Sequence, residues 1–126
     1  MTETNKTAAA TAPTPPVLPA CPVETTLTLI SDKWKVLILR DLLSGTKRFG
    51  ELKKSIGHVT QKVLTAQLRQ MEESGLLTRT VYAEVPPRVE YTLTELGYSL
   101  KPILDAMLVR GENYKKKVET EWGQDA

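Results

Sequence analysis

The stretch KRFGELKKSIGHVTQKVLTAQLRQMEESG, residues 47–75, decides the fold of this chain. Apolar residues recur in it at the spacings of three and four that are typical of helices. They are Phe49, Leu52 and Ile56 in a first group and Leu64, Leu68 and Met71 in a second. Gly57 separates the two groups, Thr60 stands at an N-cap position, and Gly75 follows the second group. Two short helices joined by a tight turn with glycine predict a helix-turn-helix.

The segment that follows, LLTRTVYAEVPPRVEYTLT (76–94), is typical of strands. Its hydrophobic period is about two residues, and it mixes β-branched and aromatic residues, namely Val81, Tyr82, Val89 and Tyr91. The letters EVPP supply a turn between two strands. A hairpin directly after a helix-turn-helix predicts a winged helix with residues 84–88 as the wing tip. The expected fold class is therefore mainly α with a small β-hairpin (α+β).

Further helices are predicted on both sides of this unit. Pro22 begins a short helix, and SDKWKVLILRDLLSG (31–45) forms another that starts at Ser31 or Asp32 and ends at Gly45. This second helix is apolar on two sides, which is expected of a central helix covered by its neighbours. After the strands, Thr94 caps a long closing segment, in which Pro102 predicts a kink or a break into two helices.

The closing segment carries an apolar stripe that a winged helix alone does not cover. It consists of Leu96, Leu100, Ile103, Leu104, Met107, Leu108 and Tyr114. The stripe either packs on the first helix of its own chain or is buried against a second copy of the chain. We favour the second copy, and hence a dimer, because a long uncovered apolar stripe is most simply buried in that way.

The 126 residues suit one domain, which we expect at 21–120 between a disordered tail at 1–20 and a C-terminal tail at 121–126. A hydrophobic content of 40% and a charged content of 25% are ordinary for a soluble protein, and no apolar run approaches the length of a membrane span. The single cysteine excludes an internal disulfide framework and a multi-cysteine metal site. A reducing cytoplasm is therefore the expected location.

Charge is concentrated in the middle of the chain. The net charge is only +2, but nine basic and two acidic residues lie from residue 33 to residue 69. A basic segment in a nearly neutral protein indicates an anion-binding face, such as a face for nucleic acid. The alternative is a set of ordinary solvated helix faces, and charge alone does not decide between the two.

The second helix of the predicted helix-turn-helix would turn four polar side chains outward, namely Gln61, Lys62, Thr65 and Arg69. In the major groove Gln pairs with adenine, Lys or Arg pairs with guanine, and the methyl group of Thr meets that of thymine. Arg88 beside the wing tip would reach the minor groove or a phosphate. The basic residues expected on the flanking DNA backbone are Lys47, Arg48, Lys53 and Lys54.

An enzyme finds little support in the sequence. His58 is the only histidine, and no acidic or cysteine partner forms a metal-binding set with it. The sequence contains neither a glycine-rich phosphate loop nor a nucleophile elbow. We therefore expect no catalytic site, no metal and no cofactor.

Cys21 stands at the N-cap position before Pro22. The N–H groups of the first helical turn would point toward its sulfur, and together with the helix dipole they would favour the thiolate. A thiolate attacks disulfides, electrophiles and hypochlorite. Glu24 lies nearby, and many lone cysteines simply fill space. A sensing role and a packing role therefore both stay open on physical grounds.

From Cys21 to about Gly111 the chain resembles the HxlR-type family of bacterial winged-helix transcriptional regulators. The matching stretches are CPVETTLTLISDKW (21–34), KRFGELKKSIGHVTQKVLTAQLRQMEESGLLTR (47–79) and VPPRVEYTLTELGYSLKPIL (85–104). The chain departs from the family in two places. It has SDKW where the family often has GGKW, and Arg110 where the final helix often has a Trp before a Gly.

The resemblance implies a homodimer, held by its first and last helices, that binds a near-palindromic operator. It implies that the outward set from Gln61 to Arg69 lies on the recognition helix and Arg88 on the wing. Family members with a cysteine at this CP position include regulators that respond to quinones, aldehydes or oxidants, which would assign that role to Cys21. The expected function is a sequence-specific DNA-binding regulator, and more specifically a repressor. The alternative is a winged helix that serves as a protein-interaction module without sequence-specific DNA binding.

Overall fold

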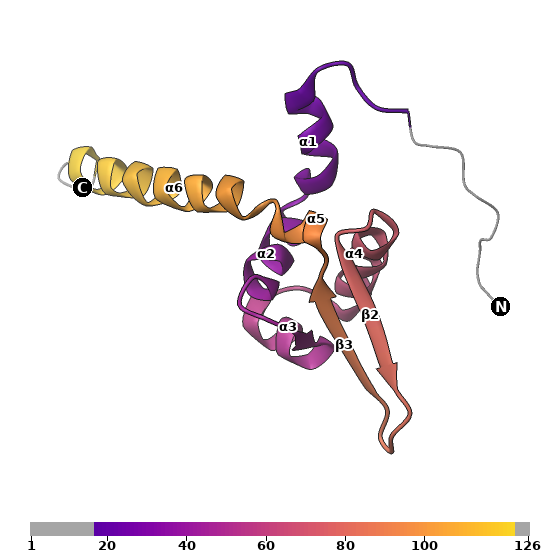
Figure 1. Ribbon diagram of the computed structural model, residues 1–126. Helices are drawn as coiled ribbons and strands as arrows, with labels where there is room; N and C mark the ends of the chain where they lie inside the picture. The colour runs from indigo at the N-terminus through magenta and orange to yellow at the C-terminus, as the bar shows by residue number, and fades with distance from the viewer. Residues whose placement is uncertain (1–16, 123–126) are drawn as a thin grey trace.

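The computed structural model describes residues 17–122 (Figure 1). In chain order the elements are α1 (Pro22–Ile30), α2 (Lys33–Leu42), β1 (Lys47–Arg48), α3 (Phe49–Ile56), α4 (Gln61–Glu73), β2 (Leu77–Tyr82), β3 (Arg88–Leu93), α5 (Glu95–Tyr98) and α6 (Lys101–Glu121). The order of α2, α3, α4 and the β2–β3 hairpin is that of a winged helix-turn-helix, as predicted. Of the two predicted tails, residues 1–16 and 123–126 lie outside the described residues.

The hydrophobic core lies between α2, α3, α4 and the sheet. Ile38, Leu39 and Leu42 of α2 are 0% exposed, so α2 is the central helix that its two apolar faces predicted. Leu52 of α3 and Leu64 of α4 are also fully buried. Because α4 buries one side in this core, its other side is held in a fixed direction toward solvent.

The sheet has three antiparallel strands in the order β1-β3-β2, one strand more than the sequence predicted. The extra strand β1 pairs Lys47 with Tyr91 and Arg48 with Glu90. Its two residues are too few to show an alternating hydrophobic pattern, so the period of the sequence could not indicate it.

The bounds of the wing also need a correction. Arg88, predicted in the wing tip, is the first residue of β3, where it pairs with Tyr82.

In three helices the predicted N-cap side chain forms a capping hydrogen bond. The side chain of Asp32 accepts a hydrogen bond from the Trp34 N–H at the start of α2, and Thr60 and Thr94 cap α4 and α5 in the same way. Within SDKW, the residue that caps α2 is Asp32. The end of α2 is the exception, because the helix stops at Leu42, three residues before Gly45.

Two helices extend away from the core (Figure 1). Helix α1 has no buried residue, and Val23 on its surface is 69% exposed. The predicted break near Pro102 is confirmed, because α5 ends at Tyr98 and α6 begins at Lys101. Only Leu104 of α6 is buried, and Leu108 is 61% exposed. Between residues 17 and 122, no helix combines the length and the apolar character that crossing a membrane requires.

Candidate nucleic-acid interface

Helix α4 separates its apolar and polar side chains as the sequence predicted. Leu64, Leu68 and Met71 are buried in the core. The opposite face is exposed and carries the four predicted DNA-reading residues together with one alanine, namely Gln61, Lys62, Thr65, Ala66 and Arg69. These five side chains line one shallow depression, so the structure brings the four predicted residues together. We call this surface the reading face.

The start of α4 is fixed by the turn that precedes it. Gly57 has a φ of 88°, a value that residues with a Cβ rarely adopt, and it ends α3 in a tight turn. Three residues later the hydroxyl of Thr60 accepts a hydrogen bond from the Val63 N–H at 3.1 Å. His58 lies in this turn with its ring 5.1 Å from that of Trp34 in α2. The N-terminal end of the reading face is therefore held against α2.

Two polar contacts join the middle of α4 to α2. The ammonium group of Lys35, which is almost fully buried, donates a hydrogen bond to Oε1 of Gln70 at 2.9 Å. The amide of Gln67 donates to Oδ2 of Asp32 at 3.4 Å, a long hydrogen bond. Buried polar groups need partners, and these contacts are made only at one position of α4 relative to α2. They set the direction in which the reading face points.

A hollow of about 410 Å³ lies between α4 and the sheet, and we call it the α4–sheet hollow. Its apolar lining comes from Phe49, Leu68, Val89 and Tyr91. Its polar lining comes from Gln61, Thr65, Arg69, Glu72 and Arg79. Three residues of the reading face, Gln61, Thr65 and Arg69, thus also border this hollow.

Arg79 is the basic residue of this lining that was not predicted from the sequence. A signal for it existed in the strand pattern. Residues 77, 79 and 81 alternate with residues that face the other way, so Arg79 shares its sheet face with Leu77, which is buried in the core.

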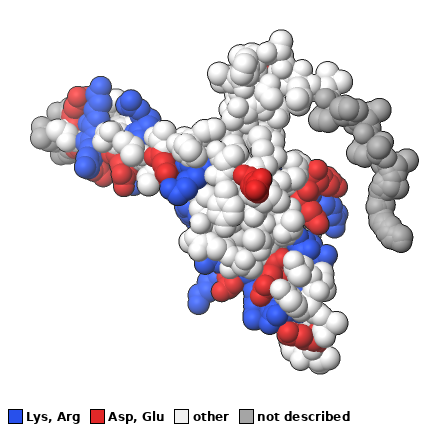
Figure 2. Space-filling view, in the orientation of Figure 1, with Lys and Arg blue, Asp and Glu red and all other residues white. Residues whose placement is uncertain are grey.

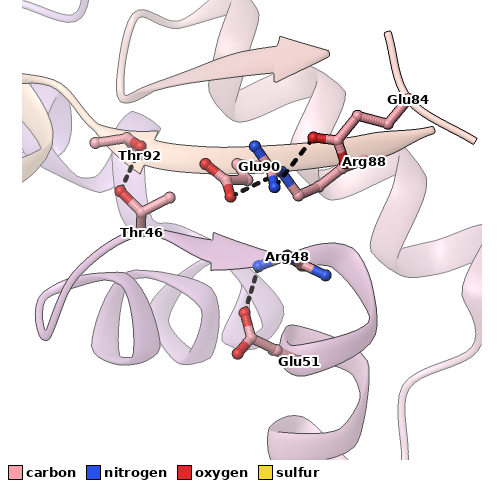
Figure 3. Close-up of polar contacts among 7 residues, drawn as sticks. All are labelled: Thr46, Arg48, Glu51, Glu84, Arg88, Glu90 and Thr92. Atoms are coloured by element: carbon pink, nitrogen blue, oxygen red, sulfur yellow. Dashed lines mark hydrogen bonds and ion pairs between the residues drawn. The ribbon is translucent and has the colours of Figure 1, made fainter. Parts of the chain in front are cut away.

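The two predicted backbone contacts in β1 point to different places. Arg48 is exposed and borders a hollow with residues 84–89 of the hairpin. Its backbone N–H donates to the carboxylate of Glu51 at 2.8 Å (Figure 3). Lys47 lies instead in a depression between α2 and α3 with Asp41 and Glu51. The structure therefore joins Arg48 to the hairpin surface but leaves Lys47 apart from the reading face.

Arg88 is held by its neighbours in the hairpin (Figure 3). Its Nη1 lies 3.2 Å from the carboxylate of Glu84, and its Nε lies 3.3 Å from that of Glu90. The guanidinium group also stacks on the ring of Tyr82, with 4.1 Å to the ring centroid. Only 27% of the Arg88 side chain is exposed. Its positive charge is therefore compensated by two carboxylates, which the residue pattern did not reveal.

Charged side chains of both signs lie around the lower part of the core and along α6, whereas the visible face of α1 is uncharged (Figure 2).

The other predicted contacts to the DNA backbone, Lys53 and Lys54, lie in the last turn of α3. Within residues 17–122, no group of three or more His, Cys, Asp or Glu side chains is arranged to hold a metal ion.

Cys21 lies at the start of α1, on the opposite side of the core from the hairpin (Figure 1). It is the N-cap residue, as predicted, and it is exposed. The expected contacts between its sulfur and the N–H groups of the first turn are not formed, because its side chain makes no capping hydrogen bond. Its backbone carbonyl is used instead and accepts the N–H of Thr25 at 2.9 Å.

Comparison with known proteins gives consistent matches. The sequence profile of the HxlR-like helix-turn-helix family matches residues 29–119. The HTH-type transcriptional regulator YdeP of Bacillus subtilis is 48% identical over 99 residues, which cover 79% of this chain and 77% of that protein. An HTH-type transcriptional regulator of Methanothermobacter thermautotrophicus is 51% identical over 94 residues, which cover 75% of this chain and 72% of that protein.

A solved structure with the same fold is that of the redox regulator HypR in its oxidized form. It superimposes with a TM-score of 0.70 at 46% sequence identity. The match covers 74% of this chain and 96% of the HypR chain.

Proposed function

The chain belongs to the HxlR-like helix-turn-helix family of transcriptional regulators, and on that premise we propose that it is a homodimeric repressor that binds a near-palindromic operator. DNA binding in transcriptional regulation follows from the family itself. The observation that carries the more specific proposal is the reading face, on which four side chains able to contact bases are exposed together on one rigid helix.

Each residue of the proposed site has a role. Gln61, Lys62, Thr65 and Arg69 contact base edges in the major groove, with Gln suited to adenine and Lys or Arg to guanine. Arg48 and Lys47 bind phosphates that flank the groove, and Arg88 binds at the wing. For Arg88 to do so, a phosphate must replace at least one of its present carboxylate partners.

The proposed dimer is supported by the apolar surfaces of the two extended helices. Val23 and Leu27 of α1 are exposed, and so are Ile103, Met107 and Leu108 of α6. Exposed apolar surface of this kind marks protein interfaces. In a two-fold dimer the two α4 helices would enter successive major grooves about one helical turn apart, which requires a near-palindromic operator.

We further propose that Cys21 senses electrophiles or oxidants. The support is an exposed thiol at the start of a proposed interface helix, and the similarity to HypR, which is described as a redox regulator. An electrophile such as a quinone would form an S–C bond with the thiolate. An oxidant would accept two electrons and two protons from two thiols as they join in a disulfide. The second thiol must come from another subunit or a small molecule, because the chain has one cysteine.

No enzymatic activity and no cofactor are part of this proposal. We include the cytoplasm as the place of action because the proposed partner is chromosomal DNA. The competing function, a winged helix that binds only proteins, would not need the exposed set from Gln61 to Arg69.

Binding to the DNA upstream of the chain's own gene tests the regulator proposal. We expect a gel shift at physiological salt that random DNA of equal length does not compete away. The variant Gln61→Ala/Arg69→Ala should lose this preference, whereas Lys116→Ala on α6 should keep it. Equal binding to both DNAs would refute sequence-specific regulation and favour the interaction module.

Two further measurements test the dimer and the sensor. Light scattering after gel filtration should give twice the chain mass for the wild type, and Met107→Glu should lower it. A wild type that stays monomeric would refute the dimer. A quinone or hypochlorite should release the wild type from DNA but not Cys21→Ser. Equal release of both proteins would eliminate Cys21 as the sensor.

A further inference from the structure

We infer that Arg79 of β2 holds one strand of the DNA backbone in the α4–sheet hollow, opposite Arg69 of α4. This inference rests on the proposed DNA binding and adds a residue to it. It concerns a phosphate contact, which fixes the position of the protein on the duplex and carries no sequence information itself.

The register of the sheet determines where Arg79 points. It is paired directly with Tyr91 of β3, and directly paired residues of two strands lie on the same face of the sheet. Tyr91 is buried against the core helices, with 7% of its surface exposed. Arg79 is therefore on the face of the sheet that carries α4, and it borders the hollow together with Arg69.

The electrostatic state of Arg79 differs from that of Arg88. Among residues 17–122, no carboxylate lies within ion-pairing distance of Arg79 or of Arg69. Arg88, the other arginine of the hairpin, has two such partners. A phosphate that reaches Arg79 breaks no ion pair among the described residues, whereas a phosphate that reaches Arg88 must displace a carboxylate.

The position of the hollow relative to the reading face identifies its occupant. Gln61, Thr65 and Arg69 border both surfaces, so the two are adjacent along one edge of α4. When the reading face lies in the major groove, a backbone strand that flanks this groove runs along that edge. Two arginines on opposite walls of the hollow then bracket a phosphate of the strand, and guanidinium groups bind phosphate oxygens well.

Glu72 limits how far the strand extends into the hollow. It lies one turn beyond Arg69 on α4, about 4.5 Å along the helix axis, at the end of the hollow away from Gln61. Its carboxylate repels phosphate, so the strand lies between Gln61 and Arg69 and does not extend past Arg69.

The test measures binding to a random-sequence duplex of about three helical turns by fluorescence anisotropy at several salt concentrations. Each phosphate contact contributes about 0.9 to the slope of log affinity against log salt, so loss of both Arg79 residues of a dimer should reduce the slope by about 1.8. The ratio of wild-type to Arg79→Ala affinity should therefore be about 12 times larger at about 50 mM than at about 200 mM salt.

Three variants make the result specific. Arg79→Lys keeps the charge and should restore the slope, while Lys116→Ala removes a charge from α6 and should leave the slope unchanged. Arg79 is exposed and makes no ion pair among the described residues, so thermal unfolding should show that Arg79→Ala is folded.

An unchanged slope for Arg79→Ala overturns the inference. A defect on the specific operator alone, without a slope change, also overturns it, because this would indicate a base contact. Failure of the wild type to bind any duplex would refute the proposed function instead.

Discussion

Removal of the Glu84 carboxylate is expected to strengthen DNA binding. Glu84 lies on the wing and forms an ion pair with Arg88 over 3.2 Å. In the variant Glu84→Gln, the shape of the side chain is kept and its negative charge is lost. Among the described residues, Glu90 is then the one carboxylate left beside Arg88, and a phosphate displaces one carboxylate fewer on binding.

The size of this gain follows from the exposure of the pair. The side chains of Arg88 and Glu84 are 27% and 48% exposed, so solvent and salt screen their interaction. Pairs of this kind contribute about 0.2–1 kcal/mol, which corresponds to about 1.4-fold to 5-fold in affinity per protomer. A dimer with both wings changed should bind about 2-fold to 30-fold more tightly.

Fluorescence anisotropy with a labelled duplex at moderate salt measures this gain, and a double-mutant cycle with Arg88→Ala assigns its cause. Part of the gain should disappear in the Arg88→Ala background, because there is no arginine left to release. Glu112→Gln on α6 removes an equal charge away from the hairpin and serves as the matched control. An equal gain with and without Arg88 would show that general charge repulsion, and not release of Arg88, explains the effect.

Three further predictions concern stability and are measured by urea or thermal unfolding. Thr60→Ala removes the cap of α4 and should lower the free energy of unfolding by about 1 kcal/mol, while Thr60→Ser should restore most of this loss. Equal stability of the wild type and both variants would contradict a role for the hydrogen bond to Val63. Gly97→Ala should lower the free energy of unfolding by about 1–3 kcal/mol, because the added Cβ would overlap the Leu76 carbonyl oxygen. An unchanged stability would mean that α5 moves freely. Leu68→Ala leaves a cavity under the reading face and should lower the free energy of unfolding by about 2–5 kcal/mol. A loss below about 1 kcal/mol would show that the core collapses around the site.

The sequence was sufficient to predict α4 and its reading face. Thirteen residues span more than three turns, so the buried stripe from Leu64 to Met71 is repeated often enough to define both faces. A cap at Thr60 and a glycine at residue 75 mark its two ends. Because the outward direction of each side chain follows from helical geometry, the exposure of Gln61 and Arg69 could be predicted without tertiary information.

Two parts of the site depend on tertiary contacts and could not be predicted. The pairing of β1 with β3 joins residues more than forty positions apart, and β1 is too short to show a pattern of its own. The ion pairs of Arg88 depend on how the hairpin places Glu84 and Glu90 beside it, so the sequence pattern did not indicate them. For Arg79 the strand pattern indicated the sheet face, but its closeness to α4 depends on how β2 packs along that helix.

The exposed thiol at the start of α1 also gives the protein a natural attachment point for a spectroscopic probe. Because Cys21 is the only cysteine, a thiol-reactive nitroxide would label each chain once without any change of sequence. α1 buries none of its residues, so the label would not disturb the core. In the proposed dimer the two spins would report one distance between the outer ends of the two α1 helices. A change of that distance when DNA is added would measure how far the subunits move relative to each other.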